Sequence, residues 1–245
     1  MQQHQGMIPR FLCLGLLLVL LSACAGRPAW EEVDPQRQAQ AYTNLGFGLF
    51  SEGDYQRALR EFNRALQVRP HFAEAHHGMA LTLQAQGEDQ AAESHFRQAL
   101  RHDPQMTAAR NNYAAFLFAQ SRYDEARIQL ELASQDLLYE QRWLVFENLG
   151  FLALEMDNKS QARHDFERAL RLNPGRRATR IRLFELLMEA EAYSAAQAQW
   201  RSLQEDPNLD PQVIRLGITL AQYTGDQREE QRLWQQLRLA AEDRD

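Results

Sequence analysis

The chain has 245 residues, of which 44% are apolar, and its formal net charge is −6 at neutral pH. An apolar fraction of this size excludes an intrinsically disordered chain and predicts a folded protein with a sizeable core. The negative charge argues against a nucleic-acid partner, because a surface that neutralises phosphates must be basic.

The first 23 residues have the pattern of an export signal. Arg10 precedes an apolar run from Phe11 to Leu21, which is too short to cross a bilayer of about 30 Å as a helix but is typical of a signal-peptide core. The sequence Leu-Ser-Ala-Cys that follows resembles a bacterial lipobox, in which Cys24 is lipidated and becomes the first mature residue. The alternative is ordinary signal cleavage after Ala23-Cys24-Ala25, which has a small-x-small pattern. Both alternatives predict export, and either Met1 or Met7 can start the leader.

A single cysteine remains once such a leader is removed. Cys13 lies inside the leader and Cys24 is the only other cysteine, so we expect no disulfide, zinc site or thiol catalysis. Alanine rather than aspartate follows Cys24, which by resemblance to bacterial sorting rules favours the outer membrane. Residues 24–38 contain one glycine and two prolines, and they are interpreted as a lipidated flexible tether.

From residue 39 onward the chain repeats with a period of 34 residues. Positions 4, 8 and 11 of each repeat share one stripe of a first helix, and positions 20, 24 and 27 share one stripe of a second helix. The first repeat carries this pattern as Tyr42, Leu45, Gly46, Leu49, Ala58, Phe62, Ala65 and Pro70. The pattern resembles the tetratricopeptide repeat. It predicts an all-α solenoid over residues 39–245, with about six helix-turn-helix repeats that form a right-handed superhelix.

The repeat is interrupted once. Pro70, Pro104 and Pro174 close the first, second and fourth repeats, but Leu138 stands where the third repeat should end in proline. Two extra residues are present before the pattern resumes at Phe146. We interpret the interruption as a longer bridge, over residues 136–142, that changes the angle between two halves of the solenoid. A neutral loop insertion is the alternative.

Motifs that carry catalysis are absent from the sequence. It has no phosphate-binding glycine loop, nucleophile elbow or zinc-protease helix, so we expect no catalytic or metal-binding residue, no cofactor and no small-molecule substrate. His71, His76 and His77 are close in sequence, but adjacent histidines on a helix point apart and are interpreted as structural. Glu147 and Glu155, on one helical face, are the only support for an enzyme.

Binding is therefore the expected activity, on the concave face of the solenoid. Positions 5, 9 and 12 of each first helix are expected to line that face. Most of them are apolar, which predicts a groove for an amphipathic or apolar segment of a protein partner. Only Asn111 fits the basic and asparagine pattern of repeat proteins that clamp a carboxylate. The alternative is that the phenylalanines fill the solenoid interior. The predicted groove residues are Phe47, Phe50, Leu81, Asn111, Phe118 and Phe151.

The interrupted segment is more specific than the generic repeat positions. Its informative residues are Asn111-Asn112-Tyr113, Phe116-Leu117, Arg122 to Ala126, Ala133 to Asp136, Leu138-Tyr139 and Val145 to Gly150. Together with the lipobox, they resemble the type IV pilus biogenesis and stability lipoproteins, called PilF in some bacteria and PilW in others. The resemblance extends from the lipobox through all six repeats.

This resemblance implies a function that composition alone does not. Such proteins act as pilotins, which help the pilus secretin to reach the outer membrane and to form multimers there. By the resemblance, the lipid on Cys24 would be the outer-membrane anchor, and the groove would hold a segment of the secretin. The alternative is a general adaptor lipoprotein of the cell envelope, which would scaffold peptidoglycan enzymes or outer-membrane assembly factors.

Overall fold

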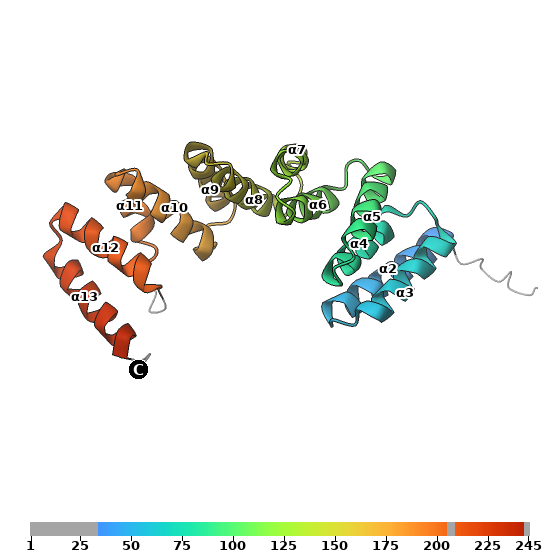
Figure 1. The fold of residues 1–245 in the computed structure, drawn as a ribbon, viewed down its shortest axis with the longest axis horizontal. Helices are drawn as coiled ribbons and strands as arrows, with labels where there is room; N and C mark the ends of the chain where they lie inside the picture. Colours follow the sequence, from blue (N-terminus) through green and yellow to red (C-terminus); the bar gives the residue numbers. More distant parts are fainter. Residues whose placement is uncertain (1–33, 205–208, 243–245) are drawn as a thin grey trace, which may run out of the picture.

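The computed structural model describes residues 34–204 and 209–242 of the chain. Within these residues the structure contains helices and no strand, as an all-α protein requires. The helices are α2 (Pro35–Ser51), α3 (Tyr55–Val68), α4 (Ala73–Ala85), α5 (Asp89–His102), α6 (Thr107–Ala119), α7 (Tyr123–Ala133), α8 (Arg142–Glu155), α9 (Lys159–Leu172), α10 (Arg177–Glu189), α11 (Tyr193–Trp200), α12 (Pro211–Thr224) and α13 (Gln227–Glu242). They pack as consecutive pairs that follow one another along a curved array (Figure 1). The prediction of about six helix-turn-helix repeats is therefore confirmed.

The first helix begins earlier than the sequence analysis predicted. Asp34 is the N-cap of α2, and its Oδ1 accepts a hydrogen bond of 3.0 Å from the amide of Gln36. Pro35 occupies the first helical position, where its missing N–H costs nothing. Residues 35–38 are thus part of the solenoid and not of the tether, which corrects the predicted boundary at residue 38. The signal peptide predicted over residues 1–23 and the lipidation site Cys24 lie outside the described residues.

The turns inside the helix pairs record the repeat period directly. Each turn contains one residue with a left-handed backbone, φ between 54° and 80°. These residues are Gly53, Gly87, Ser121, Asp157, Glu191 and Gly225. Their spacings are 34, 34, 36, 34 and 34 residues, so the two-residue slip lies between Ser121 and Asp157 and nowhere else in the series. The fifth and sixth repeats therefore keep the same spacing of turn residues.

Small residues at position 8 allow the two helices of a repeat to approach closely. A Cβ atom on Gly46 would lie 2.6 Å from the ring of Phe62, and one on Gly150 would lie 2.5 Å from the ring of Phe166. Both rings are fully buried. These two glycines therefore have a packing role, since any side chain there would displace a core ring.

The interruption appears as a longer connection between repeats. Four residues join α3 to α4, α5 to α6 and α9 to α10, whereas residues 134–141 join α7 to α8. The bridge predicted over residues 136–142 is thus present, although it starts two residues earlier and α8 already includes Arg142.

Candidate functional site

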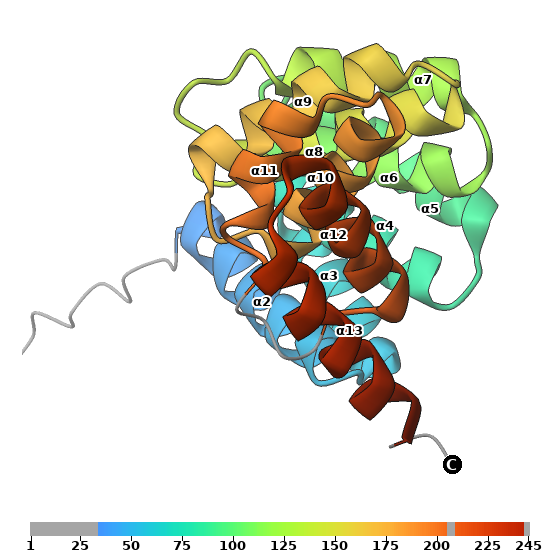
Figure 2. The ribbon, with the colours of Figure 1, turned by 90° about the vertical axis from the view of Figure 1, so that its left-hand side faces the viewer.

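The first helices of the repeats line the inner side of the array. Figure 1 shows α6 and α8 on the inner side of the arch, and α7 and α9 on the outer side. Figure 2 looks along the array and shows it curving from α2 past α7 and α9 to α13. The predicted groove residues all belong to the first helices α2, α4, α6 and α8.

Five of the six predicted groove residues are half-buried, and one is fully buried. Phe47, Phe50, Leu81, Phe118 and Phe151 keep part of their side chains accessible. They also support the interior: the ring of Phe47 meets the ring of Phe62 edge-on, with centroids 5.1 Å apart, and Phe151 meets Phe166 in the same way at 5.2 Å. These side chains therefore both pack and line the inner surface.

Position 5 of the first helices faces the neighbouring repeat rather than the groove. Asn111 is only 2% exposed, and its Oδ1 accepts a hydrogen bond of 2.9 Å from Nδ2 of Asn148. His77 occupies the same position one repeat earlier, and its Nε2 lies 2.9 Å from Nδ2 of Asn112. Burial lowers the pKa of His77 to about 4. The two side chains link successive repeats, so Asn111 lies beneath the groove surface and not on it.

An apolar pocket of about 330 Å³ opens on the inner surface between α6 and α8. It exists because position 9 carries Ala115 in the third repeat, whereas the same position carries Phe47, Leu81 and Phe151 in the first, second and fourth repeats. The side chains of Phe118 and Phe151 form its walls, and Ala115 is exposed at its floor. The lining residues are Ala114, Ala115, Phe118, Leu130, Asn148, Phe151 and Glu155. A pocket of this size and character fits one bulky apolar side chain of a partner.

The acidic pair that offered support for an enzyme does not form a catalytic site. Glu147 is buried and is bound by Arg176, whose Nη2 lies 2.9 Å from Oε2 of the carboxylate, while the hydroxyl of Thr179 donates to Oε1. Glu155 is exposed at the rim of the pocket. With one carboxylate held by a guanidinium in the packing between repeats, the two cannot share acid–base roles.

Sequence reasoning missed that two further histidines join His71 and His76, whereas His77 faces the next repeat. His95 and His102 of α5 meet His76 of α4, with the Nδ1 atoms of His76 and His95 2.9 Å apart. Burial lowers the pKa of His76, and burial with the nearby His76 lowers the pKa of His95 to about 4. No three metal-ligand residues are arranged to hold an ion in the described part of the chain. The helical positions of His76 and His95, on the two facing helices of one pair, were the signal that could have joined them.

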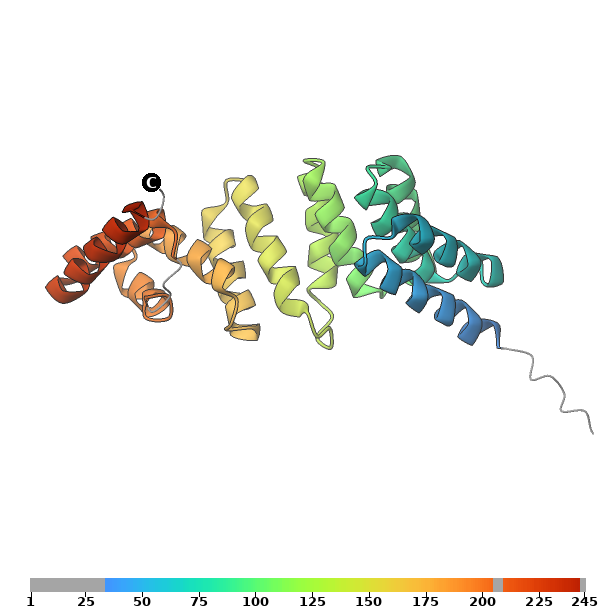
Figure 3. The ribbon, with the colours of Figure 1, turned by 90° about the horizontal axis from the view of Figure 1, so that it is seen from below.

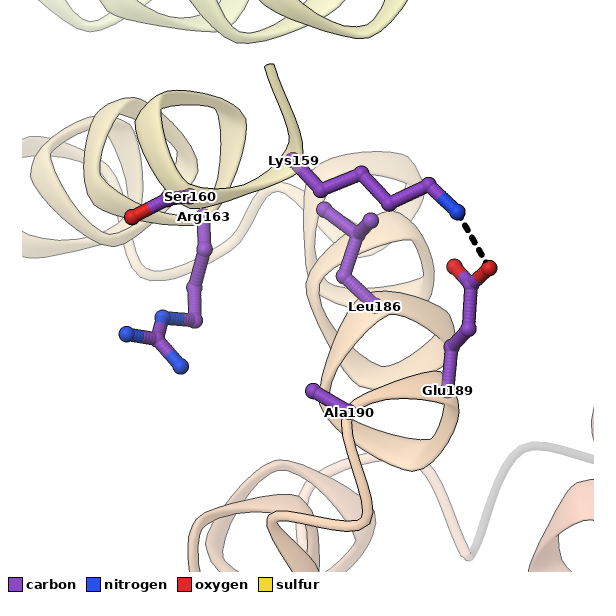
Figure 4. A pocket seen from close by; sticks show the side chains of 6 residues that line it. All are labelled: Lys159, Ser160, Arg163, Leu186, Glu189 and Ala190. Carbon is purple, nitrogen blue, oxygen red and sulfur yellow. Dashed lines mark hydrogen bonds and ion pairs between the residues drawn. The ribbon is translucent and has the colours of Figure 1, made fainter. Parts of the chain in front are cut away.

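Two other cavities are more polar than the pocket between α6 and α8. One, of about 380 Å³, lies between α9 and α10, and its lining residues Lys159 and Glu189 form an ion pair (Figure 4). The other, of about 360 Å³, lies between α7, α8 and α9, with Asp165 and Arg168 among its lining residues. Neither contains a predicted groove residue, so the apolar pocket is the best candidate for a partner's anchor.

Comparison with known proteins places this architecture in a family. The tetratricopeptide repeat family matches residues 37–105, 83–137 and 145–176. The type IV pilus assembly protein PilF of Pseudomonas aeruginosa is 32% identical over 215 residues, which cover 86% of this chain and 85% of PilF. The chain belongs to the PilF family of tetratricopeptide-repeat proteins.

Solved structures agree with membership of the PilF family. A structure from the functional characterisation of Pseudomonas aeruginosa PilF has a TM-score of 0.75 and 32% identity, with 84% of this chain and 93% of that chain covered. The crystal structure of PilW, described as a widely conserved type IV pilus biogenesis factor, has a TM-score of 0.65 and 23% identity, with 82% and 92% covered. The second likeness concerns the fold alone. In the part of the chain that the structure describes, each helix is too short or too polar to cross a membrane.

Proposed function

We propose that this protein is a lipid-anchored outer-membrane factor for type IV pilus biogenesis, which acts as a pilotin for the pilus secretin. The observation that carries the proposal is the relationship to PilF, a type IV pilus assembly protein, over most of both chains. Repeat solenoids bind partners on their concave face, and an apolar pocket opens on the inner surface of this one.

The inner surface supports binding of an apolar segment. The pocket between Phe118 and Phe151 accepts one large side chain, and the half-buried Phe47, Phe50 and Leu81 continue the apolar surface along the earlier repeats. Affinity in such a groove comes from a few buried anchors and not from the total contact area. A secretin segment with apolar side chains at helical spacing would match this surface.

The leader sequence supports the proposed outer-membrane localisation. Leu21-Ser22-Ala23-Cys24 fits a lipobox, and alanine at residue 25 favours the outer membrane. A multiply acylated Cys24 anchors stably, whereas one acyl chain is marginal. A bound secretin would then be delivered wherever the lipid is delivered.

The test is the amount of heat-resistant secretin multimer in outer-membrane fractions of wild type, of a deletion strain and of a Cys24→Ala strain. We expect fewer multimers in the deletion strain, and mislocalised or absent multimers in the Cys24→Ala strain. Unchanged multimers in both strains would reject the pilotin role. Broad envelope defects in that case would favour a general adaptor for peptidoglycan enzymes or outer-membrane assembly factors.

A further inference from the structure

The loop between α7 and α8 presents two adjacent leucines to solvent. Leu137 is 74% exposed and Leu138 is 92% exposed. Leu138 occupies the position where the first, second and fourth repeats carry proline, in a connection of eight residues, whereas four residues join α3 to α4, α5 to α6 and α9 to α10. Single exposed leucines are ordinary on protein surfaces. Two large apolar neighbours at the tip of an ordered loop instead indicate a surface that another molecule covers.

The loop is held in place by contacts that leave both leucine side chains outside. Oδ2 of Asp136 accepts a hydrogen bond of 2.6 Å from Oγ1 of Thr107, and Oδ1 accepts one of 3.0 Å from the amide of Leu138. These hydrogen bonds lower the pKa of Asp136, and the bond from Thr107 has the largest effect. The carboxylate of Asp136 therefore stays charged and bound. Nε of Arg142 donates to the carbonyl of Ser134 at 2.9 Å. Hydrogen bonds thus fix the conformation of the loop, and both leucine side chains remain exposed.

The loop and the start of the solenoid lie on one edge of the array. We call this the leading edge, where first helices begin and second helices end. Residues 134–141 lie on it, and so does Asp34, the N-cap of α2. In Figure 3 the loop between α7 and α8 is at the bottom of the view and the blue start of α2 is at the lower right, on the same side of the helices.

The predicted tether joins the solenoid at that same edge, at the start of α2. Residues 24–33 connect Cys24 to Asp34, and even a fully extended segment of this length spans at most about 35 Å. A lipid on Cys24 therefore holds the leading edge near the bilayer. Tethering also raises the local concentration of the loop at the surface, so that burial of two leucine side chains is sufficient to keep it there.

We propose that Leu137 and Leu138 insert into the lipid surface to which the protein is anchored, and so set the orientation of the solenoid on the membrane. The inference rests on the proposed lipid anchor. A lipid occupant fits better than a protein groove, because adjacent leucines on a projecting loop do not make the i, i+3, i+4 stripe that a groove binds. Glu140, exposed beside the leucines, favours zwitterionic over anionic head groups.

The test uses the chain from residue 24 to residue 245, in which Cys24 is the only cysteine. Its thiol is coupled to a maleimide lipid in phosphatidylcholine vesicles, which replaces the natural anchor by a chemical one. Hydrogen exchange of the backbone amides in residues 134–141 is then compared between the coupled and the free protein. We expect exchange at least roughly tenfold slower on vesicles, because burial of one leucine changes a partition constant by about that factor.

A double variant and a matched control make the result specific. Leu137→Ser with Leu138→Ser removes the inserting side chains from an exposed loop, and should abolish the slower exchange on vesicles. Ile128→Ser removes an apolar side chain of α7 that is 53% exposed but lies away from the loop, and should leave the slower exchange unchanged.

Two outcomes overturn the proposal. One is equal exchange in residues 134–141 for the coupled and the free protein. The other is protection that arises with purified secretin in the absence of vesicles and not with vesicles, which would assign the leucines to a protein partner. Because the coupling is chemical, neither outcome depends on whether the cell lipidates Cys24. The amount of secretin multimer in cells tests the pilotin role separately.

Discussion

Arg176, the residue before α10, donates hydrogen bonds to both carboxylate oxygens of Glu147 in α8. Its Nη2 lies 2.9 Å from Oε2 and 3.2 Å from Oε1 of the buried carboxylate, and its guanidinium lies 4.3 Å from the centre of the Trp143 ring. The hydroxyl of Thr179 in α10 donates to the same carboxylate. Arg176 and Thr179 of the fifth repeat thus donate to one buried carboxylate of the fourth repeat and join the two repeats.

Removal of the guanidinium should be costly, because it leaves Glu147 buried without its ion pair. We expect Arg176→Met to lower the free energy of unfolding by about 3 kcal/mol, measured by urea titration. Arg182→Met is the matched control, since Arg182 pairs with Glu185 at the surface and should cost less than about 1 kcal/mol. Equal losses for the two variants would contradict a structural role for the buried pair.

Two glycines in first helices should respond to alanine in opposite directions. A Cβ at Gly150 would lie 2.5 Å from the Phe166 ring, while a Cβ at Gly48 would meet nothing within 4 Å. We expect Gly150→Ala to destabilise the protein by about 1–2 kcal/mol through overpacking. Gly48→Ala should stabilise it by up to about 1 kcal/mol, because alanine is the better helix former. Thermal and urea unfolding of both variants check this, and destabilisation of both would refute the packing argument.

Stability should fall below neutral pH because His77 is buried in its neutral form. Burial lowers the pKa of His77 to about 4 in the folded state, against about 6.5 in an unfolded chain. The unfolded state therefore binds more protons between pH 6.5 and pH 4, so the stability present above pH 6.5 is lost progressively across this window as the pH falls. From pH 7.5 to pH 5 this single group removes about 2 kcal/mol of unfolding free energy.

The pH prediction is checked with His77→Gln, which cannot titrate. Urea unfolding at pH 7.5 and pH 5 should show a smaller loss of stability in the variant than in wild type, whatever its stability at pH 7.5. His164→Gln is a suitable control, because His164 is an exposed histidine of α9. If wild type and His77→Gln lost the same unfolding free energy between these pH values, burial of neutral His77 would not be the cause of the loss.

The pocket between α6 and α8 should be closed by phenylalanine at position 9, the residue that the first and fourth repeats carry there. Ala115→Phe places at position 9 the side chain found at Phe47 and Phe151, and Ala115 is exposed, so the change in stability should stay within about 1 kcal/mol. Affinity for the periplasmic part of the secretin should fall at least about tenfold, because a lost anchor removes more than 1.4 kcal/mol of binding free energy.

The control for the pocket is Ala91→Phe on α5, an exposed alanine on a second helix of the neighbouring repeat. It adds the same apolar surface outside the pocket and should leave the affinity unchanged. Calorimetry or surface plasmon resonance measures both. If Ala115→Phe bound as well as wild type, the secretin would occupy another surface.

Local sequence information was sufficient for the fold because a repeat protein contacts mainly its neighbours in sequence. Position 8 must be small where a ring from the second helix crosses it, and this one constraint places Gly46 against Phe62 and Gly150 against Phe166. The period and the single slip were readable from the apolar positions and the prolines, and the left-handed turn residues from Gly53 to Gly225 follow the same period and slip. The start of α2 was misjudged because Pro35 reads as a loop residue unless Asp34 is recognised as its cap.

Tertiary structure decided what lies on the surface and what lies between repeats. Asn111 and Phe118 both belong to the series predicted to line the groove, yet one is bonded to Asn148 inside the solenoid and the other forms the wall of a pocket. The helical period gives the direction of a side chain from its own axis, but the rotation of the next repeat determines whether that direction meets solvent. Tertiary structure likewise brings His95 to His76, because the two approach only when α4 and α5 pair. The exposure of Leu137 and Leu138 depends on the hydrogen bond that joins Asp136 of their loop to Thr107.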